Sequence, residues 1–252
     1  MSDTLTAPRR GLTGTALKLI AVVTMFLDHI GAAILESTAI WVILDDAAET
    51  TIDYFFNSSA LEVIRNADVI LRAIGRVSFP IFCFLLVEGF LHTKNLRKYF
   101  LRLGVFALLS EVPFDLAFAE YWYDPYAQNI FFTLLLGLLA MTCLSRFGDR
   151  SLPGLLLALG CIGLGELFRV DYGGFGVALI VLLYLLRDRK VLQTVAGCVA
   201  LSWEVTAPLA FIPIRLYNGE RGRSLPKYFF YAFYPLHILL LCLVREVMLR
   251  WP

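Results

Sequence analysis

The sequence predicts an all-α fold: a polytopic integral membrane helix bundle of eight or nine spans with a cytoplasmic N-terminus. The chain has 252 residues, of which 59% are hydrophobic and only 17% charged, and its mean hydropathy is +0.72. Soluble domains are roughly 45–50% apolar and about 25% charged, so this chain is too apolar for water. Its long apolar runs lack the alternation of barrel strands, so helices are the expected form.

Candidate spans are apolar stretches of about 20 residues, the length that crosses the bilayer core. The segment 190–217 is polar in part and broken by prolines, so it is either one irregular span or a pair of short ones. We treat residues 1–252 as one transmembrane domain, because no segment outside the spans is large enough for a substantial domain. The clear candidates are 15–36, 68–92, 97–119, 129–146, 152–168, 173–187 and 228–250.

Basic residues gather in alternate connections, which predicts the orientation, because Lys and Arg are retained on the cytoplasmic side. The segment 37–67 holds five acidic residues and only Arg65, and the connection 120–128 holds no basic residue. The basic segment 218–227 favours nine spans unless its arginines bind a ligand. The first end and the second, fourth and sixth connections are basic (Arg9, Arg10, Lys18; Lys94, Arg97, Lys98; Arg146, Arg150; Arg187, Arg189, Lys190).

Several functional classes are not expected. The net charge of +1 gives no bulk attraction to nucleic acid. The five cysteines lie in apolar runs without CxxC spacing, so neither a disulfide nor a thiolate metal site is expected. The three histidines lack metal-site spacing, and no glycine-rich phosphate loop or nucleophile elbow occurs. Function is therefore sought among ionisable groups inside apolar segments, which are costly in lipid and face the bundle interior.

The first span carries Lys18 and His29 on one helix face. They are eleven residues apart, which leaves a net rotation of about 20° and a separation of about 16 Å along the helix. A cation at the cytoplasmic edge and an imidazole at mid-depth suit a long anionic carrier; the alternative is a positive-inside lysine and a satisfied core histidine. Asp28 points about 100° away from His29, so we expect a carboxylate from another helix to orient the ring.

Two like-charged pairs lie at matching depth in the second and third spans. Arg72 and Arg76 are four residues apart, and so are Glu111 and Asp115. Like charges at this spacing repel each other, so the simplest solution is a pair of interhelical arginine–carboxylate bridges. In the alternative, an arginine binds a substrate carboxylate or a developing oxyanion.

Other charged residues lie at the predicted inner ends of the spans. Glu88 and His92 form either a carboxylate-oriented imidazole or an ordinary helix pair. A cluster of cations at the start of the third span either snorkels to the interface or binds phosphate; it comprises Arg97, Lys98 and Arg102. Arg221 lies beside the glycines of LYNGERG (216–222), in an anion site or a flexible basic loop.

Polar residues also mark the predicted outer ends. Asn129 opens the span at 129–146. Asp171 precedes the span at 173–187, where it acts either as a helix cap or as part of a site. In the last span, His237 follows Pro235 and several tyrosines.

These segments together resemble the TraX family, membrane proteins linked to N-terminal acetylation of conjugative pilin. More distantly, the pattern is similar to the large membrane acyltransferase superfamily that uses cytoplasmic acetyl-CoA, whose members carry a basic residue and a catalytic histidine separated by ten residues, as Lys18 and His29 are. The similar stretches are LKLIAVVTMFLDHIG (17–31), LRAIGRVSFPIFCFLLVEGFLHT (71–93), KYFLRLGVFALLSEVPFDLAF (98–118), QNIFFTLLLGLL (128–139), DYGGFGV (171–177), LYNGERG (216–222) and KYFFYAFYPLH (227–237).

The resemblance implies a multi-pass acetyltransferase of the bacterial inner membrane. It would pass an acetyl group from acetyl-CoA to a hydroxyl or amine on a peptide (such as the pilin N-terminus), glycan or lipid. His29 would act as general base or transient acyl carrier, with Asp28 and Glu88 as further catalytic candidates. The donor would contact Lys18, His92, Arg97, Lys98, Arg102 and Arg221. The acceptor side would be shaped or scaffolded by Arg72, Arg76, Glu111, Asp115, Asn129, Asp171 and His237.

Two other functions remain open from the sequence. Buried charges also mark transport paths, so the chain could be a membrane transporter. It could also be a non-catalytic protein of pilus or secretion assembly.

Overall fold

The computed structural model describes residues 10–37, 59–119, 121–223, 225–226 and 228–250, and these residues confirm the all-α prediction. Most of the acidic segment 37–67 and Arg9 lie outside the described residues. In chain order the elements are α1 (Gly14–Ile30), the π-helical turn η1 (Gly31–Leu35), α4 (Ser59–Gly75), α5 (Ser78–His92), α6 (Leu96–Phe118), α7 (Ile130–Phe147), α8 (Leu152–Leu167), α9 (Gly173–Leu185), α10 (Lys190–Ala200), the 3-10 turn η2 (Ala207–Ala210), α11 (Phe211–Arg215) and α12 (Phe229–Arg250).

Four described stretches are long and apolar enough to cross a membrane: Gly14–Leu35, Glu62–His92, Ile130–Phe147 and Phe229–Met248. Helices α8, α9 and α10 are apolar but shorter, and α6 has 23 residues that include several charges. The segment 190–217 forms short helices rather than one span. The chain is thus a helical membrane protein, while the total of eight or nine spans and the side of the N-terminus stay predictions.

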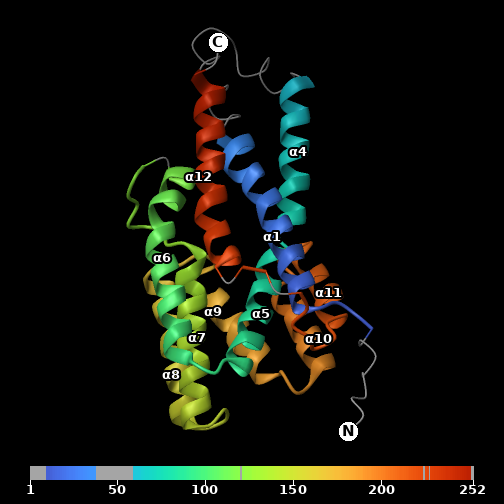
Figure 1. Cartoon of the computed structure of the whole chain (residues 1–252), viewed down its shortest axis with the longest axis vertical. Coiled ribbons are helices and arrows are strands. Elements are labelled where there is room, and N and C mark those ends of the chain that lie inside the picture. The colour runs from blue at the N-terminus through green and yellow to red at the C-terminus, as the bar shows by residue number, and fades with distance from the viewer. Residues whose placement is uncertain (1–9, 38–58, 120, 224, 227, 251–252) are drawn as a thin grey trace.

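The alternate connections lie at opposite ends of the molecule. In Figure 1 the connections α5–α6, α7–α8 and α9–α10 are at the lower end of the view. The connections that follow α6 and α8 are joined to each other, because Gln128 N donates to Arg169 O (3.1 Å) and Asp171 N donates to Gln128 O (2.8 Å). The basic connections of the sequence therefore share one end, as the orientation argument requires.

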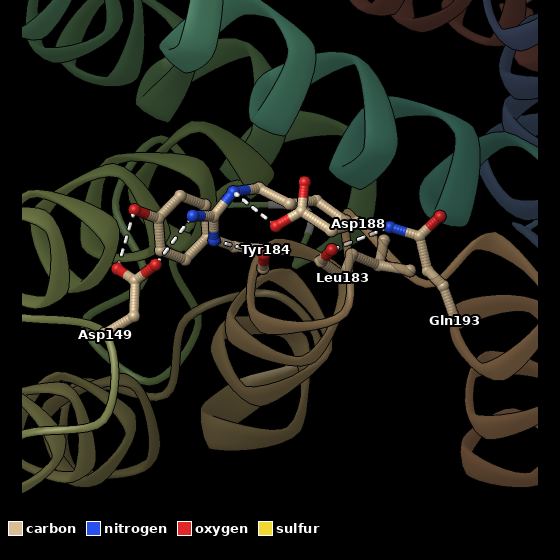
Figure 2. Close-up of polar contacts among 6 residues, drawn as sticks. Asp149, Leu183, Tyr184, Asp188 and Gln193 are labelled. Carbon is tan, nitrogen blue, oxygen red and sulfur yellow. Dashed lines mark hydrogen bonds and ion pairs between the residues drawn. The ribbon is translucent and has the colours of Figure 1, made fainter.

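Side-chain contacts also hold the helices together at this lower end. Asp149, in the turn between α7 and α8, accepts a hydrogen bond from the Tyr184 hydroxyl (2.9 Å) and pairs with Arg187 Nη2 (2.6 Å). The buried Gln193 of α10 donates from Nε2 to Leu183 O (2.7 Å) (Figure 2). These contacts tie the turn between α7 and α8 to α9, and α9 to α10, through polar groups that would otherwise be unpaired.

Polar residues set the starts of four described helices. In each case a side-chain oxygen accepts a hydrogen bond from a backbone N–H of the first turn, which satisfies a donor that the helix leaves free. The capping residues are Thr13 (α1), Asn95 (α6), Asn129 (α7) and Ser151 (α8). The start of α1 is also held by the segment after α11, because Gly14 N donates to Glu220 O (2.8 Å).

The second predicted span, 68–92, is two helices rather than one, and its first helix begins before residue 68. Proline lacks a backbone N–H, so Pro80 cannot continue the hydrogen-bond ladder to the carbonyl of Arg76. The chain turns at this point, and Thr206 Oγ1 donates to the nearby Ala73 O at 2.6 Å. The break leaves Arg72 in the last turn of α4 and Arg76 directly after that helix, beside a cavity described below.

Two glycines allow α1 and the π-helical turn to approach α4 closely. A Cβ atom added at Gly75 would lie 2.1 Å from Asp28 Cβ, and one at Gly31 would lie 2.7 Å from Asp68 Oδ1. Both distances are below van der Waals contact, so only glycine permits this helix–helix spacing.

We predict that Gly75→Ala destabilises the fold, because the added methyl group must push α4 away from Asp28. Overpacking of this kind costs about 1–3 kcal/mol, which should appear as a lower melting temperature of the purified protein in detergent. Gly104→Ala is the matched control, because a Cβ at Gly104 meets nothing within 4 Å. Equal melting temperatures for the two variants would contradict the close packing of α1 and α4.

Candidate functional site

A cavity of about 410 Å³ lies between α1 with its π-helical turn, α4, α5, α6, α7 and the start of α12. Its wall includes the side chains of Asp28 and His29 from α1 and of Glu36, which follows the π-helical turn. The π-helical turn directly follows the Asp28–His29 pair, and such insertions commonly lie at functional sites. Because the cavity combines an imidazole, several charges and apolar walls, it is the candidate functional site.

His29 is paired with a second histidine. Its Nδ1 lies 2.7 Å from Nε2 of His237, and the two rings are within 9° of parallel. Nδ1 of His237 lies 2.7 Å from the carbonyl oxygen of Phe233. The expectation that a carboxylate from another helix orients His29 is therefore wrong: the orienting group from another helix is an imidazole.

Asp28 has a different role from His29, although both line the cavity. The Arg72 guanidinium forms an ion pair with Asp28 Oδ2, and its Nε lies 3.1 Å from Glu36 Oε1. One arginine of α4 thus bridges two carboxylates that flank the π-helical turn. Asp28 does not contact His29, as the rotation of about 100° per residue predicts.

The sequence predicted salt bridges from Arg72 and Arg76 of one helix to Glu111 and Asp115 of another. These bridges do not form, so that prediction is wrong. Arg76 Nη1 lies 3.4 Å from Glu204 Oε1. The carboxylates of α6 instead accept hydrogen bonds near the connection to α7. Glu111 accepts from Asn129 Nδ2 (2.9 Å), and Asp115 accepts from Asp124 N (3.0 Å).

The physical reason is helix adjacency. α4 packs against α1, whereas α6 packs against α12 and α7, so the matching depths do not bring these charges together. Asn129 caps α7 and donates from Nδ2 to Ala107 O (2.8 Å) as well as to Glu111. Asn129, Glu111 and Asp115 are therefore scaffold contacts at the connection from α6 to α7, outside the residues that line the cavity.

Asp171 lines the cavity from the turn before α9. It is not the cap of that helix, because Tyr172 occupies the N-cap position with a φ of 62° and makes no side-chain capping hydrogen bond. Burial raises the pKa of Asp171 to about 6, and the nearby charge of Asp28 adds to the shift. Tyr172 stacks on Phe79 at a ring separation of 3.8 Å, which holds this strained turn against α5.

Carboxylates outnumber cations around the cavity. The described wall carries Asp28, Glu36 and Asp171 against Arg72 and Arg76, and Glu204 pairs with Arg76 from outside it. Four carboxylates therefore face two guanidinium groups. Asp171 forms no salt bridge with any described residue, so its charge is available to a bound cation.

Cations gather instead near the start of α12, below the cavity. Lys18 Nζ lies 5.3 Å from the ring centre of Phe230, and the Arg102 guanidinium lies 6.0 Å from that of Tyr231. Thr15 Oγ1 donates to Arg221 O (2.9 Å), which holds that residue's backbone against α1. Phe230 also lines the cavity, so its ring lies between the imidazole site and Lys18.

Four other sequence candidates lie away from His29. Glu88 lines a second pocket of about 210 Å³ with Tyr217 and Arg187, and neither Glu88 nor His92 lines the main cavity. His92 Nδ1 is 2.9 Å from Glu88 O and 3.9 Å from its carboxylate, a pair within one helix in which the His92 side chain is exposed. Arg97 and Lys98 are exposed at the start of α6.

Several residues in or beside the cavity carried no usable signal in the sequence. Glu36 and Glu204 lie outside apolar helix centres, and Phe230 is one aromatic residue among many. Charge in an apolar context could have drawn attention to Glu204, but nothing in the sequence indicates that it pairs with Arg76.

Comparison with known proteins gives two matches. A family model described as "TraX protein" matches residues 13–245. The probable fimbrial assembly protein FimC, serogroup H1, of Dichelobacter nodosus is 28% identical over 255 residues, which cover 90% of this chain and 93% of that protein. No solved structure matches the chain significantly.

We predict that Arg72 and Asp28 stabilise the fold jointly. Arg72→Gln leaves two carboxylates without their cation, which is costly in a partly buried site. The double variant Asp28→Asn/Arg72→Gln should be more stable than the sum of the single losses implies, with a coupling of about 0.5–3 kcal/mol. Denaturant or thermal unfolding measures this cycle, and strictly additive losses would contradict the pairing. Arg250→Gln, which breaks an exposed pair with Glu246, should change little.

We also predict a pH-dependent effect of Asp171→Asn. Because the folded-state pKa of Asp171 is raised to about 6, ionisation of this carboxyl destabilises the folded state as the pH rises through 6. The variant should therefore melt at a higher temperature than the parent protein at pH 8. The difference should close as the pH falls toward the ordinary carboxyl pKa of about 4. A difference in melting temperature that does not vary with pH would refute this assignment.

Proposed function

The chain belongs to the TraX protein family, and on that premise we propose that it is an acetyltransferase of the bacterial inner membrane that acts in pilus or fimbrial assembly. The proposed donor is cytoplasmic acetyl-CoA, and the proposed acceptor is an amine such as a pilin N-terminus. The observation that carries the proposal is His29: an imidazole deep in a helix bundle that lines a charged cavity.

The donor side of the proposal rests on the cations around the start of α12. Lys18, Arg102 and Arg221 come from three different elements and could bind the phosphates of acetyl-CoA. Lys18 forms no salt bridge with the described residues, so its charge is available to an anion. A thioester that approaches His29 from this end must pass the ring of Phe230, which contacts Lys18 on one side and the cavity on the other.

The acceptor side rests on the excess of carboxylates around the cavity. Asp28, Glu36 and Asp171 favour a cationic group over an anionic one, so an ammonium group suits the cavity better than a carboxylate. This supports an amine acceptor over a glycan or lipid hydroxyl. The arginines are occupied by Asp28, Glu36 and Glu204, which argues against their binding a substrate carboxylate.

The chemistry requires one base near the acceptor. In one form of the reaction, His29 accepts the proton as the amine attacks the thioester carbonyl, and the CoA thiolate leaves. In the other, His29 itself attacks the thioester and then passes the acetyl group to the amine. Both forms use the same imidazole in the same cavity.

A non-catalytic role is the second candidate function. It is favoured because the Dichelobacter nodosus relative is described as a fimbrial assembly protein, and assembly does not require a chemical reaction. In that case the buried charges would maintain a binding surface for a partner, and acetyl-CoA would not be consumed.

We predict that His29→Ala lowers acetyl transfer by about 10²–10⁴-fold, because a general base contributes rate of this order. The purified protein in lipid nanodiscs would be given acetyl-CoA and a synthetic peptide that has a free N-terminal amine followed by an apolar segment. Mass spectrometry detects the acetylated peptide, and a thiol reagent detects free CoA. Arg250→Gln serves as the control variant, because its exposed ion pair lies outside the cavity.

The same assay separates the candidate functions. A peptide with a blocked N-terminus should not be acetylated, whereas continued acetylation of its hydroxyl groups would indicate a hydroxyl acceptor. A folded His29→Ala variant that transfers acetyl groups at the parental rate would remove the proposed role of His29. Absence of both acetyl-CoA binding and CoA release in the parent protein would favour the assembly role.

A further inference from the structure

The hydrogen bonds around His237 determine where its proton lies. A carbonyl oxygen can only accept, so the contact of 2.7 Å between His237 Nδ1 and Phe233 O requires a proton on Nδ1. A neutral His237 then has a lone pair on Nε2. This nitrogen lies 2.7 Å from His29 Nδ1, so His29 must donate from Nδ1.

We infer that His29 and His237 are both held as the Nδ1–H tautomer and that Nε2 of His29 is the atom that takes part in catalysis. The inference rests on the proposed acetyl transfer for its catalytic consequence, but the tautomers follow from the hydrogen bonds of a neutral histidine pair. Since Nδ1 of His29 is occupied, Nε2 is the nitrogen left for the contents of the cavity. The nitrogen is the same whether His29 is a base or an acyl carrier.

The surroundings of the pair support a neutral state. His237 is only 4% exposed, and the rings of Phe26, Phe233 and Tyr234 pack around it. No carboxylate among the described residues forms a salt bridge or hydrogen bond with either histidine. A second proton on His237 would place a buried cation among aromatic rings without a counter-ion, which is costly.

His237 is therefore a positioning residue. Its Nε2 accepts from His29 Nδ1–H, which keeps the lone pair of His29 on Nε2 for the reacting groups in the cavity. When His29 Nε2 takes a proton from the acceptor, His29 carries the positive charge and its Nδ1–H still donates to His237.

The test reads the tautomers directly by solid-state NMR of the ¹⁵N-histidine-labelled protein in lipid bilayers. An unprotonated imidazole nitrogen resonates far downfield of a protonated one, and the chain has only three histidines. Signals that vanish in His237→Gln belong to His237, and those that vanish in His29→Ala belong to His29. The expected result is protonated Nδ1 and unprotonated Nε2 in both. An Nε2–H tautomer at either histidine would overturn the inference.

Two variants of His237 separate positioning from packing. His237→Gln keeps an oxygen that can accept from His29 Nδ1–H, whereas His237→Phe keeps a ring of similar size without an acceptor. We expect His29 to keep its tautomer in His237→Gln and to lose it in His237→Phe. The rate of acetyl transfer should fall about tenfold or more further in His237→Phe than in His237→Gln. Equal tautomers and equal rates in the two variants would show that His237 only fills space.

The two proposals can fail separately. If the NMR signals show the expected tautomers but no acetyl transfer occurs in the parent protein, the hydrogen-bond inference stands and the proposed function fails. If acetyl transfer occurs but His29 carries its proton on Nε2, the proposed function stands and the role of His237 fails.

Discussion

The cavity depends on the ion pair between Arg72 and Asp28. Charged groups in an apolar helix bundle must be partnered, and this pair joins α1 to α4 at the level of the cavity. Gly75 provides the space for it, because any larger residue would collide with Asp28. Arg72 also reaches Glu36 across the π-helical turn, which holds both carboxylates in the wall. His29 faces the cavity and forms no salt bridge with the part of the chain that the structure describes.

Charge is divided along the molecule in a way that suits the proposed reaction. Carboxylates are in excess around the cavity, whereas Lys18, Arg102 and Arg221 lie around the start of α12. An anionic donor and a cationic acceptor would be attracted to opposite sides of His29, with Phe230 between the donor cations and the imidazole. The pairing of His29 with His237 rather than with a carboxylate fits this division, because it adds no further negative charge at the reacting atom.

Part of the site could be predicted from helix geometry alone. Lys18 and His29 share a face because they belong to one continuous helix, and Asp28 turns away from His29 for the same reason. The helix caps at Asn95 and Asn129 follow from short-range hydrogen bonds. The arginine bridges were assigned wrongly because matching depth says nothing about which helices are neighbours: α4 packs against α1, and α6 packs against α7 and α12.

The sequence by itself determined that this is an apolar, all-helical membrane chain with ionisable groups inside its helices, because hydropathy and helical periodicity are local properties. Only the tertiary structure decided the partners of those groups. His29 and His237 are 208 residues apart in sequence, and Arg72 meets Asp28 and Glu36 because glycines let two helices approach. Such contacts depend on helix order and spacing in three dimensions, which no local pattern of residues encodes.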